Sequence, residues 1–104
     1  MLVIIEDEYL AELYKNGKTK GKPKFSRDIE IGFIKRIIQM QQCQNTNNLR
    51  ALKSLHFEKL SGNLSGKYSI RVNKGFRIVF RIEKHGDNIK LEVICVEELN
   101  NHYS

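Results

Sequence analysis

The chain has 104 residues, of which 40% are hydrophobic and 29% are charged, and both fractions are typical of a globular protein rather than a disordered one. This length predicts a single domain over residues 1–104, excludes large multi-step machines and argues against an enzyme with its own dinucleotide domain. With 18 Lys and Arg against 12 Asp and Glu, the net charge is +6, which indicates a polyanionic partner such as nucleic acid, a membrane surface or an acidic protein.

The charge is distributed unevenly along the chain. Acidic residues dominate the two ends, and bases dominate residues 15–27 and 53–85. Cys43 and Cys95 lie far apart and outside any CxxC or Cys/His cluster, and the first residues lack the pattern of a signal peptide. No stretch reaches the roughly 20 apolar residues that a membrane span needs. We therefore expect a reduced, cytoplasmic protein with no membrane partner.

The first half of the chain predicts one strand followed by helices. Residues 2–5 are a short apolar run that favours a strand, and residues 8–14 favour a helix that Gly17 ends. A loop rich in lysine and glycine follows. Ser26 is then a good N-cap for the clearest helix, 26–42, in which apolar residues recur at helical spacing.

The second half changes from helical spacing to the alternation that is typical of strands. Leucines in residues 49–55 indicate one or two last helical turns. Apolar and polar residues alternate over 67–73 and 76–82, a turn follows at 84–87, and 89–96 is apolar on both faces near its end, as in an interior strand. This order predicts an α+β fold with N-terminal helices on one face of a small, mainly antiparallel sheet.

The register of the expected hairpin carries a functional indication. A three-residue loop, 73–75, with its glycine in the left-handed conformation, keeps the apolar and charged faces apart. It places Arg71 opposite Arg77 and Lys67 opposite Arg81 on one face. Like charges directly across a sheet are destabilising, and guanidinium groups match phosphate oxygens. Side chains that splay into water would explain one such pair, but two pairs favour an anion site.

The three histidines are candidates for acid–base chemistry. His56 lies where the helices meet the sheet, where a single histidine is more often structural, and His85 lies in an expected turn. His102 and Tyr103 favour a frayed tail, with the alternative that they fold back over the basic face. The histidines form no metal-ligand set and the chain has no nucleotide-binding loop, so we expect neither a metal nor a cofactor.

Three linked motifs carry a resemblance to a known family. They are L-H-x-x-K at residues 55–59, G-x-(aromatic)-S-I-x-V at 66–72 and (aromatic)-R-I-x-F at 76–80. The chain resembles the HigB-type killer protein toxins, a branch of the RelE superfamily found in bacterial type II toxin–antitoxin systems. The resemblance implies a RelE-like curved sheet with helices on one face. It also implies a ribosome-dependent endoribonuclease that cuts messenger RNA, and neutralisation by a helix-turn-helix antitoxin.

The resemblance also implies roles for individual residues. The family's terminal Asp-Tyr-His triplet has its counterpart here in His102 and Tyr103, in reversed order and a few residues late. The residues expected to be catalytic are Arg77, His56, His102 and Lys59. The residues expected to bind RNA are Arg71, Lys67, Arg81 and Tyr103. The implied reaction is a metal-independent attack of a 2′-hydroxyl on the adjacent phosphate, which needs a base, an acid and cations for the developing charge.

Two other functions fit the composition. One is an RNA- or ribosome-binding module without catalysis, and the other is an inactive toxin homologue bound to its antitoxin. Helix 26–42 carries too few bases for a basic membrane anchor. The His/Lys/Arg constellation is what favours an enzyme over a binding module.

Overall fold

The computed structural model describes residues 1–88 and 90–101, and its elements follow the predicted order of a strand, helices and a meander. The helices are α1 (Glu8–Asn16), α2 (Arg27–Gln42) and α3 (Thr46–Ala51), with short 3-10 turns η1 (Lys53–Leu55) and η2 (Gly62–Leu64). The strands are β1 (Leu2–Ile5), β2 (Glu58–Lys59), β3 (Tyr68–Arg71), β4 (Arg77–His85) and β5 (Leu91–Asn100). No helix in the described ranges has the length and hydropathy to cross a bilayer.

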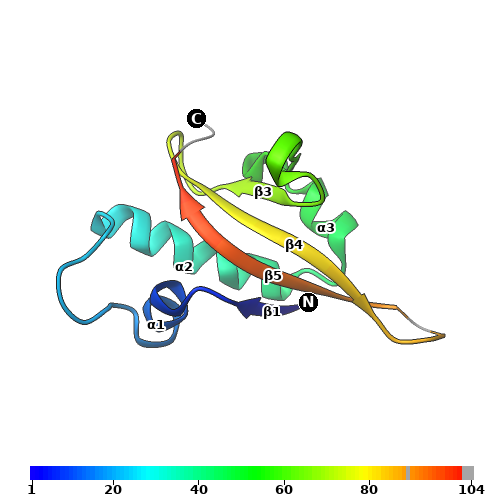
Figure 1. The fold of residues 1–104 in the computed structure, drawn as a ribbon, viewed down its shortest axis with the longest axis horizontal. Coiled ribbons are helices and arrows are strands. Elements are labelled where there is room, and N and C mark those ends of the chain that lie inside the picture. Colours follow the sequence, from blue (N-terminus) through cyan, green and yellow to red (C-terminus); the bar gives the residue numbers. More distant parts are fainter. Residues whose placement is uncertain (89, 102–104) are drawn as a thin grey trace.

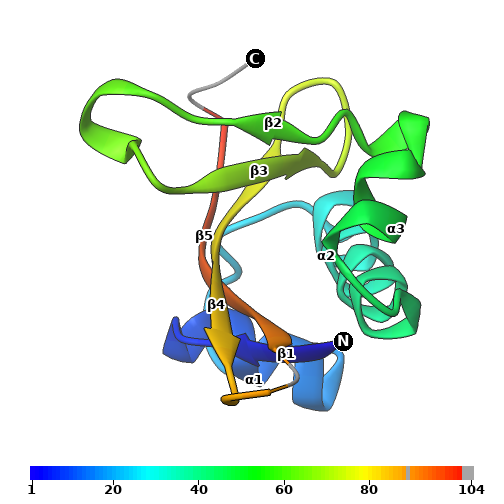
Figure 2. The same cartoon turned by 90° about the vertical axis from the view of Figure 1, so that its right-hand side faces the viewer.

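The strands form one sheet in the order β1-β5-β4-β3-β2. β1 runs parallel to β5, and the other neighbouring pairs are antiparallel. Figure 1 shows β1 beside β5 at one edge, and Figure 2 shows α2 and α3 on the same side of β4 and β5. The predicted α+β fold with a mainly antiparallel sheet is confirmed, and the parallel pairing of β1 is new.

Both predicted helix ends are confirmed. The Oγ atom of Ser26 accepts a hydrogen bond from the N–H of Ile29 at 3.4 Å, which starts α2. Gly17 ends α1 in the left-handed conformation, at φ 78°, and its N–H donates to the carbonyl of Leu13 at 2.8 Å. Glycine adopts this conformation without a side-chain penalty.

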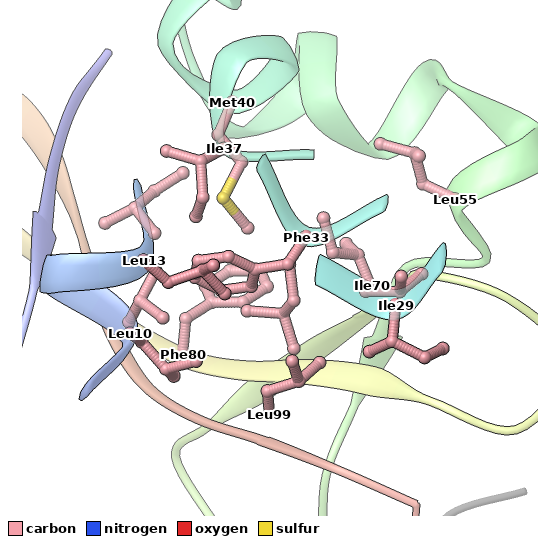
Figure 3. Close-up of a cluster of buried hydrophobic side chains, with 14 of the residues drawn as sticks. Leu10, Leu13, Ile29, Phe33, Ile37, Met40, Leu55, Ile70, Phe80 and Leu99 are labelled. Carbon is pink, nitrogen blue, oxygen red and sulfur yellow. The ribbon is translucent and has the colours of Figure 1, made fainter. Parts of the chain in front are cut away.

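The core lies between the helices and the sheet. Phe33, Ile37 and Met40 of α2 are fully buried, and their spacing places them on one stripe of the helix. Figure 3 shows this stripe near Phe80 of β4, with Leu13 of α1 beside it. Burial of each such side chain contributes about 1.5–3 kcal/mol. The helices therefore cover one face of the sheet and leave the other face for the site.

The hairpin register is the predicted one. Arg71 pairs with Arg77 and Ile70 with Ile78. Lys67 lies just before the first residue of β3. The alternation along β3 and β4 thus separates core side chains from charged ones.

The loop of this hairpin is closed by a different residue from the one expected. The prediction of a left-handed Gly75 is wrong. Instead, the Oδ1 atom of Asn73 accepts hydrogen bonds from the N–H groups of Gly75 and Phe76, each at 2.8 Å. An asparagine side chain that caps a turn in this way removes the need for a left-handed glycine.

β5 ends later than the predicted strand 89–96, whose first residue lies outside the described ranges. A bulge explains the difference. Phe80 pairs with Val96 but Val79 pairs with Glu98, so Glu97 is an extra residue that breaks the alternation. β4 also continues through His85, part of the expected turn. The extension takes β5 alongside Arg77, the first residue of β4.

Helix α2 approaches the end of β3 closely at Gly32. A Cβ atom at this position would stand 2.7 Å from the Cγ1 atom of Val72. Val72 is buried and β-branched, so it has little freedom to move aside. Gly32 is therefore required for the packing of α2 against the sheet.

We expect Gly32→Ala to lower the free energy of unfolding by about 1 kcal/mol, because the clash outweighs the gain in helix propensity. Urea denaturation of the single variants and of the double variant with Val72→Ala measures this. In the Val72→Ala background, where the clash is removed, Gly32→Ala should instead raise the free energy of unfolding. An equal penalty in both backgrounds would show that Val72 is not the obstacle.

Candidate active site

The candidate site lies on the sheet face opposite the core, which we call the outer face. Ile70, Ile78 and Phe80 point into the core, so the alternate residues of β3 and β4 point the other way. Ser69, Arg71, Arg77 and Arg81 are among the outer-face residues of these two strands. The alternation thus brings three guanidinium groups to one face.

Arg77 forms the buried centre of this face and is only 5% exposed. Its Nε atom donates to the Oγ atom of Ser69 at 2.8 Å, and its Nη2 atom donates to the backbone carbonyl of His56. The Glu58 carboxylate lies 3.7 Å from Nη2. Burial lowers the pKa of the Arg77 guanidinium, Glu58 opposes this shift and nearby Arg71 adds to it. Arg77 thus ties β4 to β3 and to the chain entering β2.

His56 has the one left-handed non-glycine backbone among the described residues, with φ 47° and ψ 57°. This conformation costs about 1–2 kcal/mol for a residue with a Cβ atom. The carbonyl contact with Arg77 holds the strained backbone, and the His56 N–H donates to the carbonyl of Lys53 at 3.1 Å. The strain directs the exposed imidazole over the outer face.

The His56 ring meets a second guanidinium. The Nη1 atom of Arg71 lies 3.2 Å from the Nε2 atom of His56. Because a guanidinium has no acceptor, a hydrogen bond between these atoms requires the ring tautomer in which Nε2 accepts and Nδ1 carries the proton. The pair therefore offers a basic nitrogen beside a cation that matches a phosphate oxygen.

The backbone of Arg71 is held from the other side of the sheet. The Nε atom of Arg36 in α2 donates to the carbonyl of Arg71 at 2.9 Å, and its Nη1 atom donates to Gln39 at 2.8 Å. Arg36 therefore couples α2 to the strand that carries Arg71. Sequence reasoning missed Arg36, because nothing in a local pattern indicates a contact across 35 residues. It also missed Ser69 and Glu58, although the hairpin register places Ser69 on the same face as Arg77 and so could have indicated it.

Lys67 and Arg81 form a second, neutralised part of the outer face. The Nζ atom of Lys67 lies 2.5 Å from Glu97. Arg81 contacts Glu6 at 2.5 Å, Glu83 at 2.6 Å and Glu97 at 3.2 Å. The hydrogen bond to Glu97 raises the pKa of Lys67, and the hydrogen bonds to the three carboxylates raise that of Arg81. Carboxylates of the protein thus offset the charge of this pair.

Of the other expected site residues, one lies on the opposite sheet face and two lie outside the described residues. Lys59 pairs with Tyr68, so it lies on the sheet face opposite that of Glu58 and Ser69. His102 and Tyr103 lie outside the described residues. β5 does end beside Arg77, because Asn100 pairs with it. The structure thus brings together His56, Arg71 and Arg77 from the predicted set.

Within residues 1–88 and 90–101, no three His, Cys, Asp or Glu side chains stand close enough to hold a metal ion. The outer face therefore offers an imidazole and guanidinium groups. This arrangement is suited to binding a phosphate and moving a proton beside it.

Sequence comparisons identify related proteins. Residues 4–95 match the model of a family described as HigB-like toxin, the RelE-like toxin of type II toxin–antitoxin system HigB. "Toxin HigB-1" of Vibrio cholerae serotype O1 is 32% identical over 81 residues, which are 78% of this chain and 83% of that protein.

Structure comparisons support the fold. The YoeB/ParE toxin from Agrobacterium tumefaciens matches with a TM-score of 0.53 at 17% identity, over 99% of this chain and 100% of that chain. The YoeB–YefM complex from Staphylococcus aureus matches with a TM-score of 0.52 at 22% identity, over 99% of both chains.

We expect Arg77→Lys to lower the free energy of unfolding by about 2 kcal/mol, because the single Nζ atom of a lysine cannot occupy both donor positions, that of Nε at the Ser69 hydroxyl and that of Nη2 at the His56 carbonyl. The matched control is Arg71→Lys, directly across the hairpin, for which we expect less than about 0.5 kcal/mol. Urea denaturation measures both. Similar small losses would mean that Arg77 does not hold His56.

The carboxylates around Arg81 predict a dependence of stability on pH. Hydrogen bonds to Arg81 lower the pKa of Glu6 and of Glu83 from 4.5. Their contribution to stability is therefore present above the ordinary carboxyl pKa and is lost as pH falls through the lowered values. Thermal melts between about pH 6 and pH 3 should show a smaller acid-induced loss in Arg81→Gln than in wild type. If the melting temperatures of wild type and Arg81→Gln fall in parallel as the pH is lowered, the carboxylates around Arg81 do not cause the acid-induced loss of stability.

Proposed function

Because this chain belongs to the HigB-like family of RelE-like toxins from type II toxin–antitoxin systems, we propose that it is a ribosome-dependent endoribonuclease that cuts messenger RNA in the cytoplasm. The observation that carries the proposal is the 3.2 Å contact between the His56 imidazole and the Arg71 guanidinium on the outer face. The proposed base, His56, and the proposed phosphate-binding cation, Arg71, are therefore adjacent before RNA binds.

The proposed reaction begins when an RNA phosphate takes the donors of Arg71. Nε2 of His56 then accepts the proton of the adjacent 2′-hydroxyl, whose oxygen forms a bond to phosphorus. The bond from phosphorus to the 5′-oxygen breaks, and that oxygen receives a proton from an acid. The products are a 2′,3′-cyclic phosphate and a 5′-hydroxyl, so no metal or cofactor is needed for the balance.

The remaining residues have proposed supporting roles. Arg77 positions His56 through its carbonyl and adds positive charge beneath the phosphate. His102 is the proposed partner that shares the acid and base roles with His56, and Tyr103 orients a nucleotide base. Lys59 remains a proposed catalytic cation, which would have to reach the phosphate from the other sheet face around the edge strand β2. Lys67 and Arg81 are proposed RNA contacts that would exchange Glu97 for phosphate.

The proposed partners follow from the same reading. The ribosome supplies the messenger RNA and completes the geometry of a small site. A helix-turn-helix antitoxin neutralises the toxin. The match to the YoeB–YefM complex supports the fold of a toxin in this class.

We expect His56→Ala to reduce cleavage about 10²–10⁴-fold, and Arg71→Ala to reduce it by at least about 10²-fold, because they remove the proposed base and phosphate-binding cation. The measurement is the mapping of new 5′ ends on translated messages after induction in a bacterial host. Lys53→Ala, three residues before His56 on the exposed side of η1, is the control and should cleave like wild type.

Melting temperatures of the purified variants show whether the loss is chemical or due to unfolding. Growth arrest by the wild type without new 5′ ends would replace the proposal with a ribosome-binding inhibitor. Neither arrest nor cleavage would indicate an inactive homologue. Unchanged cleavage in folded His56→Ala would remove His56 from the mechanism.

A further inference from the structure

A cavity lined mainly by cationic side chains lies on the core side of the sheet, beyond the end of the hydrophobic core. Along β4 and β5 the core-facing pairs are Phe80 with Val96, then Ile82 with Ile94. The next core-facing pair is Lys84 with Glu92. A cavity of about 450 Å³ opens there, between α3, β3 and the β4–β5 hairpin. Its volume falls in the range of small-ligand sites, about 300–1,000 Å³.

The cavity wall is built by hydrogen bonds to Glu92. One carboxylate oxygen accepts from the N–H of Thr46 at 2.9 Å, and the other accepts from the Thr46 hydroxyl at 2.5 Å. These bonds lower the pKa of Glu92, chiefly through the Thr46 side chain. Glu92 is thus the anchor of α3 on the hairpin, and its carboxylate is already bound by protein donors.

Cations dominate the rest of the lining. Lys84, Lys90 and Arg50 line the cavity, against Glu92 as the one carboxylate among the lining residues. The Arg50 guanidinium lies over the Phe57 ring at 4.9 Å, which holds it beside the opening. The Nζ atom of Lys90 donates to the Gly86 carbonyl at 2.5 Å, a contact that leaves its charge uncompensated. The cavity therefore favours an anion.

One aromatic and one aliphatic side chain stand next to these cations. Tyr68 and Ile82 line the cavity, and Asn47 adds an amide. The Tyr68 ring packs on Phe57 at 5.3 Å and on Phe80 at 6.1 Å between ring centroids, so its position is held. Aromatic side chains beside lysines are the combination that binds a base and its phosphate in single-stranded RNA.

We propose that this cavity binds one nucleotide unit of an RNA chain. The phosphate lies among Lys84, Lys90 and Arg50, and the base lies against Tyr68 and Ile82. The choice of RNA as the polyanion rests on the proposed function. The site is on the opposite sheet face from His56 and Arg71, so it is a second RNA contact, separate from the point of cleavage.

The test compares two double variants that remove the same charge. Lys84→Ala/Lys90→Ala should weaken binding of a fluorescent single-stranded RNA at least about tenfold and reduce the salt dependence of binding. Lys20→Ala/Lys22→Ala, in the exposed lysine-rich loop, should weaken it less than about threefold. Equal losses in the two double variants, or no loss in either, would overturn the proposal.

Two further measurements locate the ligand and its source. Adenosine 5′-monophosphate should shift the NMR amide signals of Thr46, Lys84 and Glu92, and absence of shifts would overturn the site. Cosedimentation with ribosomes that lack messenger RNA tests ribosomal RNA as the source. If Lys84→Ala/Lys90→Ala no longer cosediments with these ribosomes, the RNA bound in the cavity is ribosomal RNA. If the double variant still cosediments but no longer binds the oligonucleotide, the bound RNA is messenger RNA.

The NMR titration with adenosine 5′-monophosphate also separates this proposal from the ribonuclease proposal. A glutamate-rich peptide that shifts these amides while the nucleotide does not would replace RNA with a protein partner. Arg71→Ala should keep the nucleotide-induced shifts although cleavage is lost. If wild type binds the nucleotide but never cleaves, the ribonuclease proposal fails and this one stands.

Discussion

The contact between the Arg77 guanidinium and the carbonyl of His56 is the constraint on which the site depends. It joins the first residue of β4 to the turn between the helices and β2. It also holds a histidine in a left-handed conformation that is otherwise unfavourable. Burial of Arg77 against Ser69 makes the contact rigid, since an unpaired guanidinium inside the sheet would be costly. The exposed His56 ring is thereby held in a fixed position over the outer face.

The outer face is divided by its charge balance. Glu97, the extra residue of the β5 bulge, lies against Lys67 and Arg81, and Glu6 and Glu83 add two further carboxylates beside Arg81. At the other end, the carboxylate that the described residues place near Arg77 is that of Glu58, at 3.7 Å. The face therefore keeps an excess of positive charge near His56, whereas near β1 three carboxylates surround Lys67 and Arg81. The bulge in β5 supplies one of these carboxylates, that of Glu97.

Local patterns predict the part of the site that depends on a short stretch of chain. The pairing of Arg71 with Arg77 follows from strand alternation and from the length of one loop. The contact of Arg36 with the Arg71 carbonyl spans 35 residues, and the Arg81–Glu6 pair spans 75, so neither leaves a local signal. The parallel pairing of β1 and the bulge at Glu97 have the same origin in long-range packing. Composition indicates an anion-binding protein, and the long-range contacts decide where on the outer face carboxylates offset the positive charge.

The most direct test of this account is the protonation of the His56 ring. Two-bond proton–nitrogen correlation NMR of the labelled protein at mildly alkaline pH distinguishes the two tautomers. The account predicts that Nδ1 carries the proton and that Nε2 accepts from Arg71. It also predicts that this preference is lost in Arg71→Ala. A proton on Nε2 in the wild-type protein would contradict the account, because that nitrogen would then be unable to receive the proton of a 2′-hydroxyl.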